Sequence, residues 1–238
     1  MMREDTQRVF AALSHIPEIK QFILVGGTAI AIKANHRLSE DLDFCVTTQK
    51  LNKATVNKIM QALARDFSVT HTTDMVQQEL FQNDGLDLLE HHQAWLVDNV
   101  KLTFFCIGVS DDERKVLSEQ QVEVIDNVNV MSLDGLFVTK CLALCDRIKT
   151  RDIFDLWWLV NNTHNDIDEV FNLIQYLRPH ITYESIRYRL LDWDIPVSDE
   201  GLESVAPVTF DTVRQELRAM VNELEIDLAQ YVVKTLNP

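Results

Sequence analysis

Residues 22–44 have the sequence FILVGGTAIAIKANHRLSEDLDF, and much of the expected fold follows from this segment. The apolar run at its start predicts a strand, the glycine pair predicts a turn, and a short helix is expected over residues 29–34. A second strand is expected over residues 41–47, and it contains Asp41 and Asp43. Because alternate residues of a strand point to the same face, these two carboxylates should project together.

Two neighbouring carboxylates repel each other unless a cation lies between them. Magnesium held by carboxylates and by the phosphates of a substrate is a common solution in proteins. Asp41 and Asp43 follow a glycine turn closely in the chain, so phosphate chemistry is the first hypothesis for this protein.

The composition predicts an acidic protein, with a formal net charge of −15 and an isoelectric point near 4.8. Broad binding to nucleic acid depends on basic surface, so this charge weighs against it. A local basic cleft is still compatible with the sequence, because Lys140, Arg147, Lys149 and Arg151 lie close together in the chain. The sequence has neither an apolar run long enough to cross a membrane nor a start typical of a signal peptide, so we expect a cytoplasmic protein without a membrane partner.

The pattern along the chain predicts an α+β protein with two domains. Residues 1–131 should form an α/β domain with a mixed sheet and flanking helices, and residues 132–238 should form a helical domain. Strands are expected at 22–25, 41–47 and 68–70, as a hairpin at 94–97 and 100–107, and around Val122 to Val130. Helices are expected at 3–14, 29–34, 51–67, 132–149, 151–160, 166–178, 182–191 and 208–235, with Ser132 and Thr150 as caps and solvated loops at Asp111 to Glu113 and between Pro196 and Pro207.

Lys140 is the first candidate in the helical half. In helical projection it lies in the middle of an apolar stripe that runs from Leu133 to Ile148, and Arg147 lies at the edge of the stripe. An ammonium group on such a face is costly unless it meets an anion. Lys140 should therefore reach a nucleotide phosphate or a carboxylate, and the alternative is that its side chain extends along the apolar surface to solvent.

Asp152 and Asp155 raise the same question with the opposite charge. They lie in a segment that is otherwise rich in leucine, tryptophan and phenylalanine, so its helix should be largely buried and its acids should have partners. Asp152 could simply stabilise the start of the helix through the helix dipole. For Asp155, a functional role and a structural ion pair with Arg151 are equally compatible with the sequence.

At this point the residues resemble a known family. The segment from Gly26 to Phe44, with its glycine turn and its Asp-Leu-Asp, is similar to the nucleotidyltransferase signature of the AbiEii/AbiGii toxin family, which belongs to the polymerase-β-like nucleotidyltransferase superfamily. The later segment with Lys140, Arg147 and Arg151-Asp152-Ile153-Phe154-Asp155-Leu156 resembles the second signature of that family. Both signatures lie in the expected order and together cover roughly residues 20–160.

The resemblance implies a magnesium-dependent enzyme that moves a nucleoside monophosphate from a nucleoside triphosphate (NTP) to an acceptor and releases pyrophosphate. The acceptor would be RNA, with a transfer RNA 3′ end as one candidate, or a protein hydroxyl. The protein would be the toxin of a toxin-antitoxin or phage-defence pair, with a cognate antitoxin as partner. The fold would be the polymerase-β-like mixed sheet, and the helical domain would complete the active-site cleft.

The resemblance also implies roles for individual residues. Backbone amides at Gly26, Gly27 and Thr28 would hold the triphosphate, and Asp41 and Asp43 would carry magnesium. Lys140 would contact triphosphate oxygens, while Asp155, and second Asp152, would orient the acceptor hydroxyl or Lys140. Arg37, Ser39 and Arg147 complete the expected set that binds the nucleotide or the acceptor.

One departure from the superfamily pattern concerns a third carboxylate, which many members supply from a later strand. Here the corresponding segment, residues 101–105, contains no acid, and its only polar candidate on the inner alternation is Thr103. Two other hypotheses therefore stay open. The chain could be a catalytically degenerate nucleotidyltransferase fold that binds a nucleotide or a partner protein, or the acids could form a structural cluster with Arg37 and Lys140.

Overall fold

The computed structural model describes residues 2–192, 204–205 and 208–236. Its internal contacts divide the chain into two compact units, residues 1–136 and 137–238, and each is described here by itself. The loop expected between Pro196 and Pro207 lies largely outside the described residues. Within the described part of the chain, no helix combines the length and the apolar character that a membrane crossing requires.

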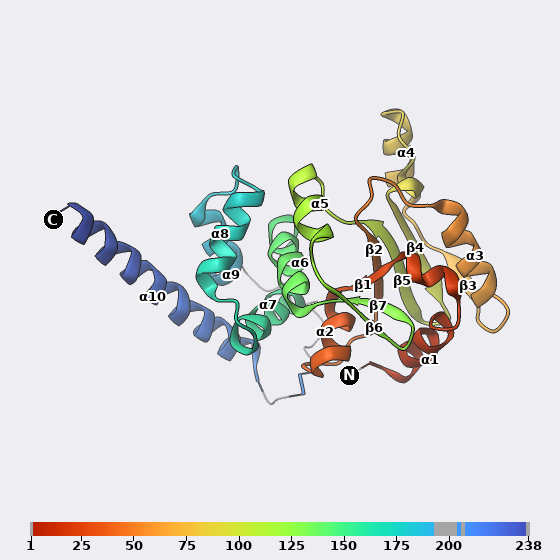
Figure 1. The fold of residues 1–238 in the computed structure, drawn as a ribbon, viewed down its shortest axis with the longest axis horizontal. Helices are drawn as coiled ribbons and strands as arrows, with labels where there is room; N and C mark the ends of the chain where they lie inside the picture. Colours follow the sequence, from red (N-terminus) through yellow and green to blue (C-terminus); the bar gives the residue numbers. More distant parts are fainter. Residues whose placement is uncertain (1, 193–203, 206–207, 237–238) are drawn as a thin grey trace. The chain divides into compact units, whose positions relative to one another are not determined.

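The first unit is built on one mixed sheet of seven strands, in the order β3-β4-β5-β2-β1-β7-β6 (Figure 1). The strands are β1 (Ile23–Val25), β2 (Leu42–Val46), β3 (Val69–His71), β4 (His92–Val97), β5 (Val100–Cys106), β6 (Val122–Ile125) and β7 (Val128–Met131). Strand β1 pairs antiparallel with β2 and parallel with β7, and β2 pairs parallel with β5. This mixed sheet confirms the α+β class, and the hairpin β4–β5 confirms the strands predicted on either side of Asp98.

The centre of the sheet is held by a buried row of side chains. Leu24 is paired with Phe44, and Phe44 with Phe104, and none of the three is exposed to solvent. The rings of Phe44 and Phe104 stack with centroids 5.7 Å apart, and Phe22 meets Phe104 edge to face at 4.8 Å. Because the side chains of a strand alternate between faces, the neighbouring row that contains Asp43 projects to the opposite side of the sheet.

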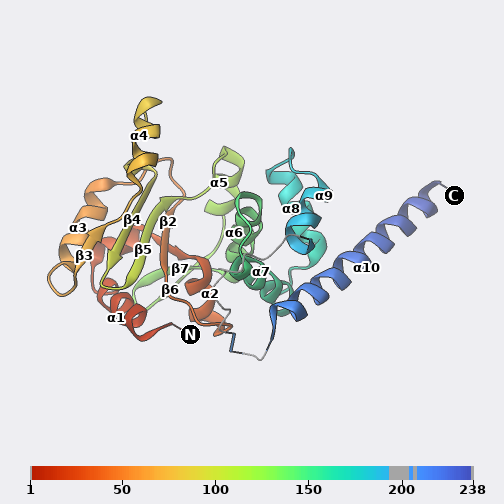
Figure 2. The same cartoon turned by 180° about the vertical axis from the view of Figure 1, so that it is seen from behind.

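The helices of the first unit that were not predicted are mainly those with few buried apolar residues. They are α1 (Glu4–Leu13), η1 (Pro17–Gln21), α2 (Gly26–Ala34), α3 (Lys53–Leu63), α4 (Met75–Asn83), η2 (Leu88–Glu90) and α5 (Asp111–Ser118). The expectation of a solvated loop at Asp111 was wrong, because Ser110 caps a helix there and the acids form its first turn. Helix α4 was not expected, since it buries no residue; it extends beyond the end of the sheet in Figures 1 and 2.

Helix α6 (Leu133–Asp146) begins in the first unit and continues into the second. Ser132 precedes it and accepts a hydrogen bond from the backbone amide of Gly135 at 3.2 Å, which confirms the predicted cap. The helix ends at Asp146 rather than at residue 149. The cap predicted at Thr150 was wrong by one position, because Lys149 is the N-cap and Thr150 is the first residue of the next helix.

The second unit consists of helices that pack on one another. They are α7 (Thr150–Asn162), α8 (Ile167–Leu177), α9 (Tyr183–Leu191) and α10 (Phe210–Leu236). Helix α10 packs against α7, α8 and α9 through the buried residues Val213, Leu217 and Val221, and its later turns extend past α8 and α9 (Figure 2). Helix α8 starts with a capping box formed by Asp166 and Glu169.

We expect Ser132→Ala to lower the free energy of unfolding by about 1 kcal/mol, because the start of α6 loses the acceptor for an amide that has no partner in the helix. Urea denaturation followed by circular dichroism measures this effect. Ser118→Ala is the matched control, since Ser118 ends α5 and donates to a carbonyl there instead of capping a helix start. Equal losses in the two variants would contradict the capping role of Ser132.

Candidate active site

The junction between β1 and α2 forms the first part of the site. Gly26 follows β1 directly and is the first residue of α2, with a φ of +73°. The helix thus starts three residues earlier than predicted, at the glycine pair itself rather than after it. The first N–H groups of a helix have no acceptor within the helix, so this start can bind an anionic group such as a phosphate.

Asp43 lies directly beside that helix start. It is the antiparallel partner of Val25, the residue that precedes Gly26. A Cβ atom placed on Gly26 would lie 3.0 Å from Oδ2 of Asp43. The carboxylate therefore occupies the space that a side chain at Gly26 would need, and only glycine satisfies both this contact and the left-handed φ.

Asp41 lies immediately before β2, one residue outside the strand that was expected to include it. Its backbone carbonyl oxygen accepts a hydrogen bond from the hydroxyl of Thr28. That hydroxyl also lies 2.8 Å from Oγ of Ser39, and both side chains are buried. Thr28 and Ser39 thus fix the chain segment that delivers the acid pair to the start of α2.

The remaining predicted residues of the first signature lie on α2 and on the segment after it. Gly27 is the second residue of α2. Arg37 is almost fully buried and donates to the carbonyl of Leu38 at 2.9 Å. An arginine at such depth needs hydrogen-bond acceptors for its guanidinium group, and the carbonyl of Leu38 is one of them.

Thr103 on β5 is the register partner of Asp43 on β2. Register partners on adjacent strands project to the same face, so the hydroxyl and the carboxylate share one side of the sheet. The Thr103 side chain is buried, and its Oγ1 has no hydrogen-bond partner among the described residues. Such buried hydroxyls are rare in proteins because leaving one unpaired is costly.

The thiol of Cys45 lies two residues after Asp43 and is fully buried. Burial raises its pKa far above the usual range, and the nearby Asp43 charge raises the pKa further. The thiol is thus protonated at neutral pH and does not supply a thiolate ligand.

The residues around Asp43 fit a magnesium ion that is shared with a substrate. No cluster of three or more His, Cys, Asp or Glu side chains suited to a metal occurs in the part of the chain that the structure describes. The described residues therefore do not form a metal site made of protein ligands alone. Magnesium, however, is commonly held by one or two carboxylates together with substrate phosphates, and the unpaired Thr103 hydroxyl is a further oxygen donor of the kind it accepts.

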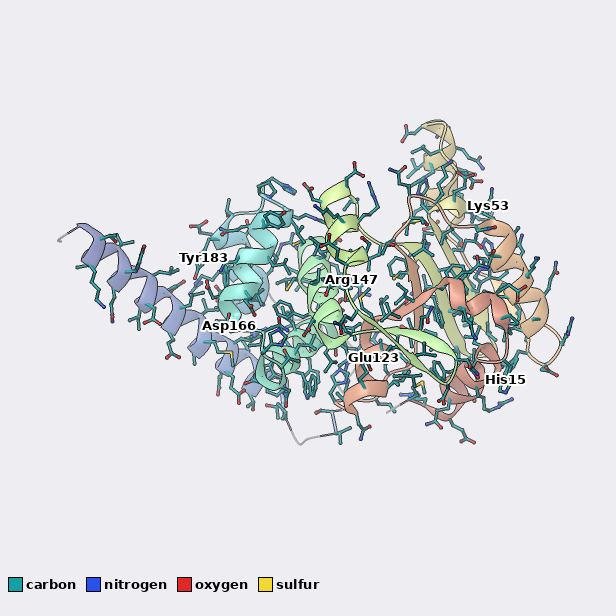
Figure 3. The ribbon with its side chains drawn as sticks, in the orientation of Figure 1. His15, Lys53, Glu123, Arg147, Asp166 and Tyr183 are labelled. Carbon is teal, nitrogen blue, oxygen red and sulfur yellow. The ribbon has the colours of Figure 1, made fainter. Side chains whose placement is uncertain are left out.

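A second group of charged residues is formed by α6 and α7. The ammonium group of Lys140 lies 2.7 Å from Oδ1 of Asp152 and 2.7 Å from Oδ2 of Asp155. Arg147, labelled in Figure 3 after the end of α6, places its Nε 2.7 Å from Oδ2 of Asp152. Lys140 and Asp155 are buried, so Lys140 meets carboxylates and does not extend to solvent.

The electrostatics of this group favour its charged form. Burial alone would raise the pKa of Asp152, but the cations of Lys140 and Arg147 outweigh burial, so the pKa lies well below its usual range. Asp152 therefore does more than stabilise the helix dipole. Asp155 forms an ion pair with Lys140, which lies on the preceding helix.

The predicted site residues thus fall into two sets. Gly26, Thr28, Ser39, Asp41 and Asp43 are linked around the start of α2 in the first unit, by the contacts and hydrogen bonds given above. The predicted residues Lys140, Asp152, Asp155 and Arg147 are linked by ion pairs in the second unit. Sequence reasoning gave the members of both sets, and orientation of Lys140 by Asp155 and Asp152 was one of the roles that the family resemblance implied. The structure adds that both acids contact Lys140 at the same time.

Comparisons with known proteins identify the family. The family described as "Nucleotidyl transferase AbiEii toxin, Type IV TA system" matches residues 8–230. An uncharacterized protein of Aquifex aeolicus, aq_aa25, is 24% identical over 210 residues, which is 85% of this chain and 87% of that protein.

Two solved structures share the fold. JHP933 from Helicobacter pylori is 17% identical and superposes with a TM-score of 0.53, with 100% of each chain covered. MenT4, a nucleotidyltransferase toxin from Mycobacterium tuberculosis, is 14% identical with a TM-score of 0.51, covering 96% of this chain and 89% of that one. At these identities the likeness concerns the fold.

We expect Gly26→Ala to destabilise the protein more than Gly85→Ala. Both glycines have a left-handed φ, +73° and +72°, so both variants carry a backbone cost of about 1–2 kcal/mol. Only at Gly26 would the new methyl group press on Asp43, because nothing lies within 4 Å of the corresponding position at Gly85. Thermal unfolding of both variants measures the difference, and equal shifts would contradict the close contact.

We expect Asp152→Asn to lower the free energy of unfolding at pH 7 by about 3 kcal/mol, because it removes one of the carboxylates that neutralise the buried Lys140. The pKa of Asp152 is depressed in the folded state, so its contribution is present above about pH 4 and is lost as the pH falls further. The variant should therefore lose less stability than the wild type on acidification below pH 4.

Urea denaturation at pH 7, 4 and 3 measures both effects. Asp5→Asn is the matched control, because Asp5 forms an ion pair with Arg8 in which both side chains are more than half exposed. Removal of such a surface pair should cost less than about 1 kcal/mol. A loss in Asp152→Asn no larger than in this control would contradict the buried network.

Proposed function

Because the chain belongs to the AbiEii family of nucleotidyltransferase toxins, we propose that it transfers a nucleoside monophosphate from an NTP to a hydroxyl of an RNA or protein acceptor. In this reaction the acceptor oxygen forms a bond to the α-phosphorus of the NTP. The bond from the α-phosphorus to the oxygen that bridges it to the β-phosphorus breaks, and pyrophosphate leaves with the electron pair of that bond. The proton of the acceptor hydroxyl passes to solvent water.

The observation that carries the proposal is the contact between Asp43 and the first residue of α2. A carboxylate attracts a cation, whereas the start of a helix attracts an anion. Here the two lie side by side, because Oδ2 of Asp43 is 3.0 Å from the position that a Cβ atom on Gly26 would take. A phosphate group and a magnesium ion bound to it match this pair of sites. Catalysis of phosphoryl transfer depends mainly on such positioning and charge neutralisation.

Within this proposal, Asp41 and Asp43 would hold the magnesium ion, which would neutralise charge on the phosphates. The backbone amides of Gly26, Gly27 and Thr28 bind the triphosphate. Thr28 and Ser39 also act as positioning residues, since their hydrogen bonds hold the backbone at Asp41. Arg37, on the same segment, supplies positive charge toward the nucleotide or the acceptor.

For the second set we propose that Lys140 is the cation that stabilises the triphosphate. Its two ion pairs with Asp152 and Asp155 fix its position, which is the preorganisation that such a role requires. Asp155 and Asp152 act as positioning residues for Lys140, with orientation of the acceptor hydroxyl as a further role. Arg147, which is about half exposed, contributes to nucleotide binding.

A cognate antitoxin is proposed as partner from the description of the family as a type IV toxin-antitoxin system. The net charge of −15 weighs against a broad nucleic-acid surface. We therefore propose an acceptor that is recognised locally, such as the 3′ end of a transfer RNA or a protein hydroxyl.

Incubation of the purified protein with magnesium, α-labelled NTPs and either total RNA or cell lysate tests the activity. We expect label to appear in RNA or protein, and we expect Asp43→Asn and Asp41→Asn to lower the transfer rate at least about 100-fold, because removal of a group that stabilises transition-state charge has costs of this size. Omission of the divalent cation should have the same effect.

Asp112→Asn is the control for these variants, because it removes an exposed acid from the first turn of α5, outside the proposed site. It should transfer label at the wild-type rate. Nucleotide binding without any transfer, unaffected by the aspartate variants, would contradict the enzymatic role and favour a degenerate nucleotidyltransferase fold that only binds its ligand.

A further inference from the structure

We propose that the hydroxyl of Thr103 is a third oxygen donor for the divalent cation at Asp43. This inference rests on the proposed function and adds a residue to its metal site. It starts from Thr103, a residue that is only 5% exposed. Its hydroxyl oxygen, Oγ1, is buried and has no hydrogen-bond partner among the described residues.

The neighbours of Thr103 on the sheet define what its hydroxyl can reach. Its partner on β4 is Ala94, which offers only a methyl group, and its partner on β2 is Asp43. Asp43 is therefore the polar side chain that register places beside the hydroxyl. Adjacent strands are about 4.8 Å apart, which is too far for most direct hydrogen bonds between short side chains that stand parallel.

That spacing suits a group that lies between the two side chains. Oxygen ligands of magnesium lie at about 2.1 Å from the ion, so two of them can be up to about 4 Å apart on its opposite sides. A cation between Asp43 and Thr103 would satisfy the hydroxyl and leave its remaining positions for Asp41, water and phosphate oxygens. The burial of Thr103 would then hold its side chain rigidly against the ion.

The charge of the site follows from this arrangement. Asp41 and Asp43 contribute −2, and a threonine hydroxyl contributes no charge, so one divalent cation neutralises the protein ligands. A third carboxylate would leave the site at −1 and would favour a second cation. We therefore expect a single divalent cation to bind in the absence of nucleotide, and Thr103 to set its affinity.

Binding of Mn²⁺ to the full chain, measured by electron paramagnetic resonance and calorimetry, tests the inference. Thr103→Val keeps the shape of the side chain and removes the hydroxyl, so the dissociation constant for Mn²⁺ should rise about 10-fold, as is typical when a group that supports a metal site is lost. Thr103→Ser keeps the hydroxyl and should stay within about 3-fold of the wild type. Thr103→Asp adds a charge and should bind Mn²⁺ more tightly than the wild type.

Thermal unfolding without metal separates this role from a structural one. Thr103→Val removes an unpaired buried hydroxyl, so its midpoint temperature should equal or exceed that of the wild type, while the rise in midpoint on addition of Mn²⁺ should be smaller. A lower midpoint together with unchanged Mn²⁺ affinity would assign the hydroxyl to packing and overturn the inference. If Thr103→Val does not fold, unchanged affinity in Thr103→Asp would overturn it as well.

Asp43→Asn distinguishes failure of this inference from failure of the proposed function. If Asp43→Asn abolishes Mn²⁺ binding and Thr103→Val leaves it unchanged, the cation site stands and the role of Thr103 is wrong. If the wild type itself binds no Mn²⁺ and transfers no label, the proposed function and this inference fail together. Transfer of label without binding of Mn²⁺ to the free protein would overturn only the role of Thr103.

Discussion

The close approach of Asp43 to Gly26 is the constraint on which the rest of the first unit depends. Antiparallel pairing of β1 with β2 sets Asp43 beside the residue where β1 ends, and the left-handed φ of Gly26 turns the chain at once into α2. A carboxylate at 3.0 Å from the Cβ position leaves no room for a side chain there. One glycine thus brings an acid and a helix start together, and the proposed phosphate and magnesium sites both follow from that contact.

Buried polar groups near this contact hold the segment before β2 in place. The hydroxyls of Thr28 and Ser39 lie within hydrogen-bond distance of each other, and the Thr28 hydroxyl reaches the backbone at Asp41. On the other side, the apolar row of Leu24, Phe44 and Phe104 fixes the register of the strands. A slip of one residue would move Asp43 into that apolar core, so the packing of one face enforces the chemistry of the other.

The second unit contains a buried network of ion pairs between side chains of opposite charge. Lys140 bridges Asp152 and Asp155, and Arg147 adds a second cation to Asp152. Buried ion pairs of this kind contribute little net stability compared with apolar packing, but removal of one partner is costly. Their presence at two largely apolar helices is consistent with the proposed role of Lys140, because a functional cation must be held in one place.

Apolar periodicity along the chain predicted the α+β class and the strands, because it is a local signal. The acids and cations of the candidate site were predicted from charges in apolar segments and from the resemblance to the family signatures. The sequence did not indicate α4, which has no buried stripe, or the start of α2 at Gly26. The fold places Asp43 beside Gly26 and Thr103, and it brings Lys140 into contact with Asp152 and Asp155 at the same time; neither arrangement can be read from positions along the chain. The physical reason is that strand register and helix packing join residues distant in the chain, and these contacts depend on how the whole core is filled.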